Sequence, residues 1–125
     1  MDDFEVEAKV YEYMVYVYLL KALDRDGAKL ASLKLARFWN QVLERLIARL
    51  TKDLTALRNQ MRQHGCRIVL EEMTSGNIVH VMYIYRRYEH HCYMLPYVLK
   101  ARCEDKLLAL LPDMLPDMLN VHNSL

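Results

Sequence analysis

The sequence predicts an α+β fold in a single domain, in the order α-α-β-β-α: a long antiparallel helical hairpin, a β-hairpin and a closing helix. Two changes of hydrophobic period support this prediction. Apolar residues recur every three or four positions between Asp26 and His64, a stretch without proline. After Gly65 the apolar period changes from 3.6 to 2, and from Pro96 onward a helical period returns.

Composition and charge limit the classes of protein to consider. The chain has 125 residues, of which 54% are hydrophobic, so it can bury a core and is not intrinsically disordered. The net charge is +1, but residues 1–27 carry seven acids and three bases, and residues 28–67 carry nine bases and two acids. This asymmetry predicts either two oppositely charged helices packed together or a basic surface that binds a partner.

The cellular location is inferred from the cysteines and from the beginning of the chain. Three cysteines, an odd number, do not indicate a disulfide framework, and a reducing compartment suits them better. The first residues are acidic and lack the cationic start of a signal peptide. The apolar run Met14 to Leu20 is too short to span a bilayer. We therefore expect a cytoplasmic protein that has no membrane partner.

The first helix is predicted from Asp3 to Leu23. Val10 to Tyr18 is rich in residues that prefer strands, so a strand is the alternative there. The flanking residues favour a helix, and the apolar positions also form a helical stripe. Residues 24–27 (Asp-Arg-Asp-Gly) form a polar turn, which predicts an antiparallel helical hairpin with the next helix.

The second helix is predicted over residues 26–64 and forms the centre of the fold. His64 and Gly65 end it, because glycine suits the left-handed position after a helix. One row of apolar residues runs along the helix: Trp39, Leu43, Leu46, Leu50, Leu54, Leu57 and Met61. A second stripe (Leu35, Phe38 and Val42) widens the apolar face of its N-terminal half. The shorter first helix cannot cover all of this surface, so later elements or another chain must cover the rest.

Two strands are predicted, Arg67 to Met73 and Ile78 to Arg86, joined by a compact loop at residues 74–77. Both faces of the second strand are largely apolar, and an isolated hairpin is not stable in water. We therefore expect both faces to be covered. Residues 87–95 are predicted to be a connection.

The closing helix is predicted from Pro96 to Leu111. The tetrapeptide Leu-Pro-Asp-Met then occurs twice, at residues 111–114 and 115–118. Because proline interrupts helices, residues 112–125 are predicted to form a peripheral tail of short turns outside a domain of residues 1–111. Whether this repeat binds a partner stays open.

The chain lacks the patterns expected of catalytic or metal sites. His80, His90, His91 and Cys92 are of metal-ligand types, but they do not have a recognised ligand spacing. Neighbouring acids such as Glu71 and Glu72 diverge on a strand or helix, whereas acid–base catalysis needs groups that converge. We therefore expect no catalytic residue, no metal and no cofactor.

The functional hypothesis is a small non-catalytic protein that self-associates as a homodimer and acts through protein–protein contacts. The expected interface uses apolar residues of the second helix and the second strand: Leu54, Leu57, Met61, Val79, Val81, Tyr83 and Tyr85. The alternative is a nucleic-acid-binding protein in which the β-hairpin acts as a wing and the long helix supplies basic residues. Its expected contacts are Lys34, Arg37, Arg45, Arg49, Lys52, Arg86 and Arg87.

Overall fold

The computed structural model describes residues 5–123, and for residues 115–123 it describes only the course of the backbone. The elements are α1 (Val6–Gly27), a 3₁₀ turn η1 (Leu30–Ser32), α2 (Ala36–Gln63), β1 (Arg67–Met73), β2 (Val79–Tyr85), β3 (Tyr88–Met94) and α3 (Pro96–Asn123). The predicted α+β class is confirmed. The order is α-α-β-β-β-α, with one strand more than the sequence predicted.

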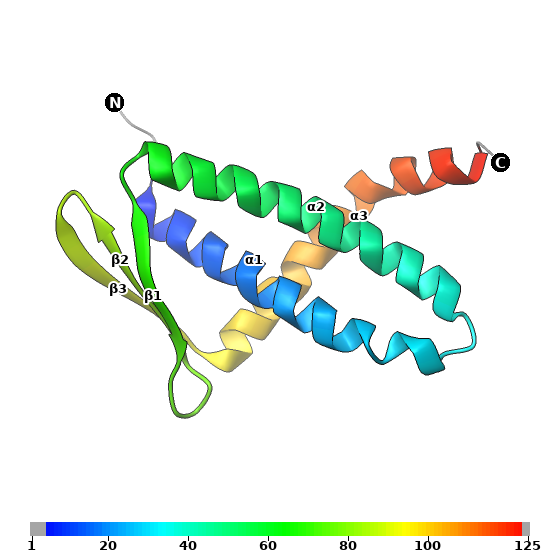
Figure 1. Ribbon diagram of the computed structural model, residues 1–125, viewed down its shortest axis with the longest axis horizontal. Helices are drawn as coiled ribbons and strands as arrows, with labels where there is room; N and C mark the ends of the chain where they lie inside the picture. Colours follow the sequence, from blue (N-terminus) through cyan, green and yellow to red (C-terminus); the bar gives the residue numbers. More distant parts are fainter. Residues whose placement is uncertain (1–4, 124–125) are drawn as a thin grey trace.

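The two long helices lie side by side and antiparallel, with the sheet at one end of the hairpin (Figure 1). The connection between α1 and α2 lies at the opposite end, and α3 crosses behind both helices. Within residues 5–123, none of the helices combines the length and apolarity that a membrane crossing requires.

Residues 10–18, for which a strand was the alternative, are helical and belong to α1. Seven side chains of this helix are buried: Val10, Tyr13, Met14, Val15, Tyr16, Val17 and Leu19. Burial on several sides stabilises this segment as a helix despite its strand-preferring residues. Helix α1 continues through the polar residues 24–27, where a turn was expected, while Asp3 and Phe4 of the predicted helix lie outside the described residues.

Helix α2 is unbroken from Ala36 to Gln63, so the prediction of one long helix is confirmed, but it begins ten residues later than predicted. At its C-terminal end, the amide of Gly65 donates to the carbonyl of Arg62 and that of Cys66 donates to Met61, at 3.0 and 2.9 Å. Gly65 has φ +73°, as this type of helix end requires. The predicted stop at Gly65 is confirmed.

The sheet has the order β1-β2-β3, and both pairs of strands are antiparallel. The predicted connection at residues 87–95 was wrong, because most of it forms β3. Arg86 and Arg87 form the turn before this strand, with φ of +54° and +71°. Two left-handed residues are typical of a two-residue hairpin turn, which normally contains glycine or asparagine. Since neither is present here, residues 86 and 87 carry no local signal for this turn.

Helix α3 starts at Pro96, as predicted, but continues past Leu111 to Asn123. The prediction that residues beyond 111 form only short turns was therefore wrong for residues 112–123; residues 124 and 125 lie outside the described part. Leu110 and Met114, one helical turn apart, are both buried, and this packing opposes the loss of the backbone hydrogen bond at Pro112.

The core lies between α1, the C-terminal half of α2, α3 and the inner face of the sheet. It contains six of the seven residues expected at a dimer interface: Leu54, Leu57, Met61, Val79, Val81 and Tyr83, with Tyr85 packed partly buried against them. These residues are covered within one chain, because the N-terminal half of α1 lies antiparallel beside the C-terminal half of α2 (Figure 1). The structure therefore places the expected interface in the core.

Candidate functional site

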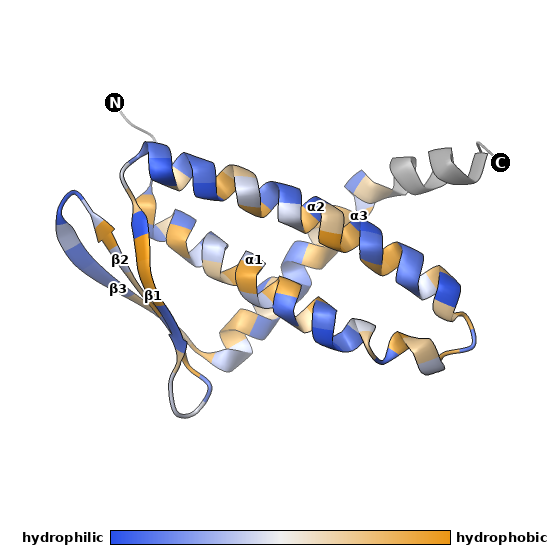
Figure 2. Ribbon diagram, viewed as in Figure 1, coloured by the Kyte–Doolittle hydropathy of each residue, from blue (hydrophilic) through white to orange (hydrophobic). Residues whose placement is uncertain are grey.

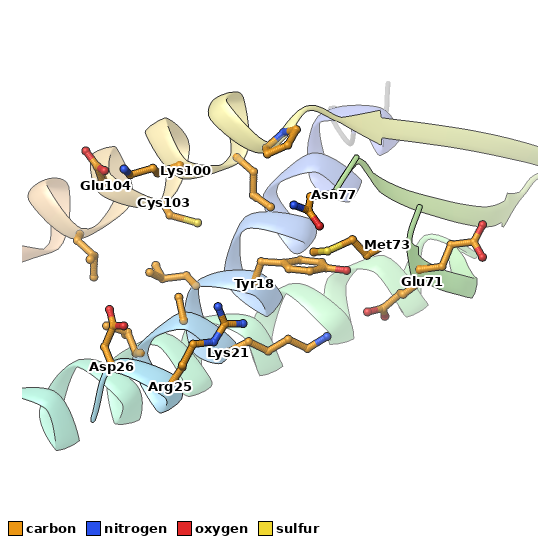
Figure 3. Close-up of a pocket in the computed structure, with 17 residues that line it drawn as sticks. Tyr18, Lys21, Arg25, Asp26, Glu71, Met73, Asn77, Lys100, Cys103 and Glu104 are labelled. Atoms are coloured by element: carbon orange, nitrogen blue, oxygen red, sulfur yellow. The ribbon is translucent and has the colours of Figure 1, made fainter. Parts of the chain in front are cut away.

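A groove with a cavity volume of about 640 Å³ lies between the C-terminal half of α1, the first turns of α3 and the β1–β2 hairpin. Apolar side chains, including Leu19, Leu23, Leu99 and Leu107, contribute to its lining. Charged residues of both signs also line it: Lys21, Arg25, Asp26, Glu71, Glu72, Lys100 and Glu104 (Figure 3). Such an apolar cavity with polar groups around it suits a bound side chain or small molecule.

Cys103 is half-buried and lines the groove from α3 (Figure 3). Its Sγ lies 3.8 Å from the backbone oxygen of Val15, to which the thiol donates. Burial raises the pKa of this thiol to about 11, with a smaller contribution from the charge of Glu104. At neutral pH the thiol is therefore protonated and is a poor nucleophile.

The polar atoms of the described residues do not indicate a missing polar ligand. Every buried side-chain nitrogen and oxygen in this part of the chain has a hydrogen-bond partner. The hydroxyl group of Tyr13 donates a hydrogen bond to Glu71. Burial, and to a smaller extent this hydrogen bond, raises the pKa of Tyr13. The charged residues that line the groove are exposed to solvent.

The connection between α1 and α2 exposes a cluster of large apolar side chains. Leu33, Leu35, Phe38 and Trp39 are 47%, 64%, 50% and 43% exposed, and the rings of Phe38 and Trp39 contact edge to face with centroids 5.1 Å apart. We call residues 28–39 the helical tip; it lies at the end of the molecule away from the sheet (Figures 1 and 2). The tip carries Lys29, Lys34 and Arg37 and no acid.

Gly27, the last residue of α1, lies against α2. A Cβ at this position would lie 2.6 Å from Cδ2 of Leu43 in α2. The absence of a side chain lets the two helices approach there. Leu43 is thus partly buried beside Gly27, whereas Leu35 and Phe38 of the second predicted stripe stay exposed.

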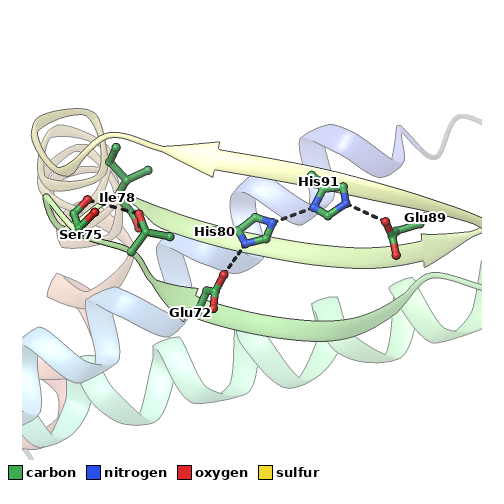
Figure 4. A network of polar contacts seen from close by, with 7 residues as sticks. Glu72, Ser75, Ile78, His80, Glu89 and His91 are labelled. Atoms are coloured by element: carbon green, nitrogen blue, oxygen red, sulfur yellow. Dashed lines mark hydrogen bonds and ion pairs between the residues drawn. The ribbon is translucent and has the colours of Figure 1, made fainter.

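The histidines form a chain of hydrogen bonds across the outer face of the sheet (Figure 4). His80 Nδ1 is 2.8 Å from Glu72, His80 Nε2 is 2.8 Å from His91 Nδ1, and His91 Nε2 is 2.9 Å from Glu89. The ring of Tyr93 stacks on His80 with centroids 4.5 Å apart.

These hydrogen-bonded side chains connect β1, β2 and β3, and the two glutamates at the ends, Glu72 and Glu89, are exposed to solvent. Of the metal-ligand types noted in the sequence, His90 and Cys92 lie on the opposite face of β3 from His91, because successive strand residues alternate. Within the described residues, no group of three or more His, Cys, Asp or Glu side chains is arranged to hold a metal ion. The hydrogen bonds of Glu72, His80 and His91 therefore link the three strands.

The basic residues expected to contact nucleic acid do not form one surface. Lys34 and Arg37 lie at the helical tip. Arg45, Arg49 and Lys52 surround Met114, where α3 crosses α2, and Arg49 also lies 3.2 Å from Asp53 and 3.8 Å from Asp113. Arg86 and Arg87 form the β2–β3 turn.

A different group of arginines gathers near the β2–β3 turn. Arg58, Arg62 and Arg67 line a second cavity of about 640 Å³ whose described lining contains no carboxylate. Ile84, two residues before Arg86, lines the same cavity and pairs with Arg67. We call Arg58, Arg62, Arg67, Arg86 and Arg87 the arginine end. The sequence analysis noted the positive charge of residues 28–67 but did not select Arg58, Arg62 or Arg67 as candidates, because their position near the turn depends on the unpredicted third strand.

Comparisons with known proteins gave one match. A family model described as YhjD protein matches residues 1–115, a range that includes the helical tip, the groove and the arginine end. No curated protein and no solved structure matches the chain.

Proposed function

The chain belongs to the YhjD protein family. From its composition and its exposed apolar surface we propose that it is a cytoplasmic, non-catalytic protein that self-associates as a homodimer and acts through protein–protein contacts. The observation that carries the proposal is the exposure of Leu33, Leu35, Phe38 and Trp39 on one short segment. Contiguous apolar surface of this kind normally marks an association site on a soluble protein. Phenylalanine and tryptophan are also enriched among the residues that dominate binding energy.

The proposed interface lies at the N-terminal end of α2, whereas the sequence analysis expected it in the C-terminal half of that helix. The sequence indicated more apolar surface on α2 than α1 could cover, and the structure leaves the N-terminal part of that surface exposed. The three free cysteines, two of them buried, are consistent with a reducing compartment. The default symmetry for self-association of a single chain is two-fold.

A double variant of the helical tip tests the proposal. Phe38→Gln with Trp39→Gln removes both aromatic rings but keeps residues that favour a helix. Because both side chains are about half exposed, we expect little change in the free energy of unfolding. We expect the dimer dissociation constant, measured by sedimentation equilibrium, to rise by about 100-fold, as for the loss of two dominant contacts.

The matched control is Tyr88→Gln, which removes an aromatic ring that is 73% exposed at the opposite end of the molecule. This variant should dimerise like the wild type. Equal dissociation constants for the double variant and the wild type would contradict an interface at the helical tip.

The arginine end favours nucleic-acid binding as a second candidate function. Arg86 and Arg87 occupy left-handed conformations that cost a non-glycine residue of the order of 1 kcal/mol each. Both arginines of the turn are exposed, and the guanidinium group of Arg86 lies over the ring of Tyr85, 5.1 Å from its centroid. Guanidinium groups with an adjacent aromatic ring suit phosphates and stacked bases.

The variant Arg86→Asn with Arg87→Gly tests this second candidate, because Asn-Gly is a preferred pair for such a turn and keeps the hairpin. If the turn contacts phosphates, binding to random single-stranded DNA should weaken. The slope of log affinity against log salt should fall by roughly 0.7 for each lost contact. Salt-independent binding, or an unchanged slope in this variant, would contradict a role of the turn in nucleic-acid binding.

A further inference from the structure

We infer that the cavity at the C-terminal end of α2 binds a small molecule that carries a phosphate or pyrophosphate group. The cavity has a volume of about 640 Å³, which is within the usual range of small-molecule sites. Arg58, Arg62 and Arg67 line it, and its described lining contains no carboxylate. This inference does not depend on self-association, and it concerns the cavity and not the β2–β3 turn.

The three arginines come together because of the way in which α2 ends. Arg58 and Arg62 are four residues apart and therefore lie on the same side of the helix. Gly65, with φ +73°, follows the end of α2, and β1 then begins at Arg67. Two elements thus bring three arginines to one cavity. Residues 54–70 contain these three arginines and no acid.

The positive charge of these arginines is not balanced within the described part of the chain. Among the described residues, none of the three has an acid as an ion-pair partner. Arg58 lies over the ring of Tyr13, with its guanidinium carbon 5.6 Å from the ring centroid. Glu71, which accepts the hydrogen bond of Tyr13, lines the groove and not this cavity. Because like charges four residues apart on a helix repel each other, a bound anion would stabilise this arrangement.

The hydrogen bonds at the end of α2 do not require arginine donors. Bases near the C-terminal end of a helix can bind its last carbonyl groups. Here the carbonyl groups of residues 60–62 accept hydrogen bonds from the backbone amides of residues 64–66. The end of the helix is therefore satisfied by the backbone, and it does not account for the three arginines of the cavity.

The lining also indicates which kind of anion fits. Guanidinium groups donate pairs of parallel hydrogen bonds that match phosphate oxygens, and several of them favour a ligand with more than one negative charge. Apolar contact for the rest of the ligand comes from four other lining residues: Tyr13, Met61, Ile68 and Ile84. A concave, partly apolar lining favours a small molecule over a nucleic-acid strand, which requires a groove that follows its backbone.

Binding of inorganic pyrophosphate to the full chain tests the site. Calorimetric titration at low salt should show saturable binding. Arg62→Gln with Arg67→Gln removes two of the three arginines at exposed positions. This double variant should raise the dissociation constant about tenfold or more, as expected for the loss of charge-assisted hydrogen bonds. Because both side chains are exposed, the urea midpoint should stay close to that of the wild type.

The matched control is Lys52→Gln with Lys100→Gln, which removes two exposed bases elsewhere and changes the net charge by the same amount. This variant should bind pyrophosphate like the wild type. Equal weakening in the control and in the arginine variant would mean that general positive charge attracts the anion, and it would overturn the site.

A second variant depends on a single exposed position of α2. Arg62→Glu places a carboxylate in the lining together with Arg58 and Arg67, so it should abolish pyrophosphate binding. If this variant folds and binds pyrophosphate like the wild type, the cavity is not the binding site.

Two further outcomes would overturn the inference and leave other proposals standing. If the wild type does not bind pyrophosphate but loses affinity for single-stranded DNA in Arg62→Gln with Arg67→Gln, the cavity belongs to a strand-binding surface. If Arg86→Asn with Arg87→Gly abolishes pyrophosphate binding and the cavity variant retains it, the anion binds at the turn. Neither outcome affects self-association, which the solution mass measures separately.

Discussion

Leu57→Glu is expected to unfold the chain. Leu57 is 5% exposed and packs in the core with Leu54 and Met61. Removing a buried leucine side chain costs about 2–5 kcal/mol, and burying an unpaired carboxylate costs more. Because domains of this size are stable by only about 5–15 kcal/mol, this variant should be largely unfolded or insoluble. Circular dichroism and urea unfolding measure the effect.

The matched control is Leu108→Glu, the same substitution on α3 at a residue that is 64% exposed. Its free energy of unfolding should stay within about 0.5 kcal/mol of the wild type. If Leu57→Glu instead folds with a normal urea midpoint and only its solution mass falls, Leu57 belongs to an interface between chains and the described core is wrong.

Ala48→Pro should destabilise the chain by about 3 kcal/mol or more, because Ala48 lies near the middle of α2. Proline there removes the backbone hydrogen bond to Glu44 and its ring clashes with that carbonyl. Helix α2 lies beside α1 along the hairpin and supplies Leu50 and Leu54 to the core, so a break at Ala48 disrupts contacts on both sides.

Ala48→Gly separates this backbone effect from the loss of the alanine methyl group. It should cost only about 1 kcal/mol, since glycine lowers helix propensity without breaking the helix. Helical content and the urea midpoint measure both variants. A fully helical Ala48→Pro variant with a normal midpoint would contradict the unbroken course of α2.

The parts of the fold that the sequence predicted correctly depend on local signals. The unbroken course of α2 follows from its apolar period, and its end follows from the need for a left-handed residue at Gly65. The start of α3 follows from Pro96. The turn at Arg86 and Arg87 has no such signal, because the rest of the sheet determines its conformation. Without that turn, β3 was mistaken for a connection.

The candidate site could be predicted only in part, because burial depends on how the helices are placed. The sequence predicted that the first helix leaves part of the apolar surface of α2 uncovered, but it placed that part at Leu54, Leu57 and Met61, which are buried, whereas Leu35 and Phe38 are exposed. Which end stays exposed depends on where α1 ends: its last residue, Gly27, lies against Leu43, so α1 helps to bury Leu54, while Leu35 and Phe38 stay exposed. The groove combines three elements distant in sequence, so no local pattern indicates it.

The measurement that tests self-association most directly is the solution mass of the wild-type chain over a concentration series. Sedimentation velocity from about 1 to about 100 μM covers the range in which a moderately tight dimer dissociates. We expect the mass to rise from 14.9 kDa toward twice that value as the concentration increases. A mass that stays at 14.9 kDa up to the highest concentration would contradict the proposed dimer.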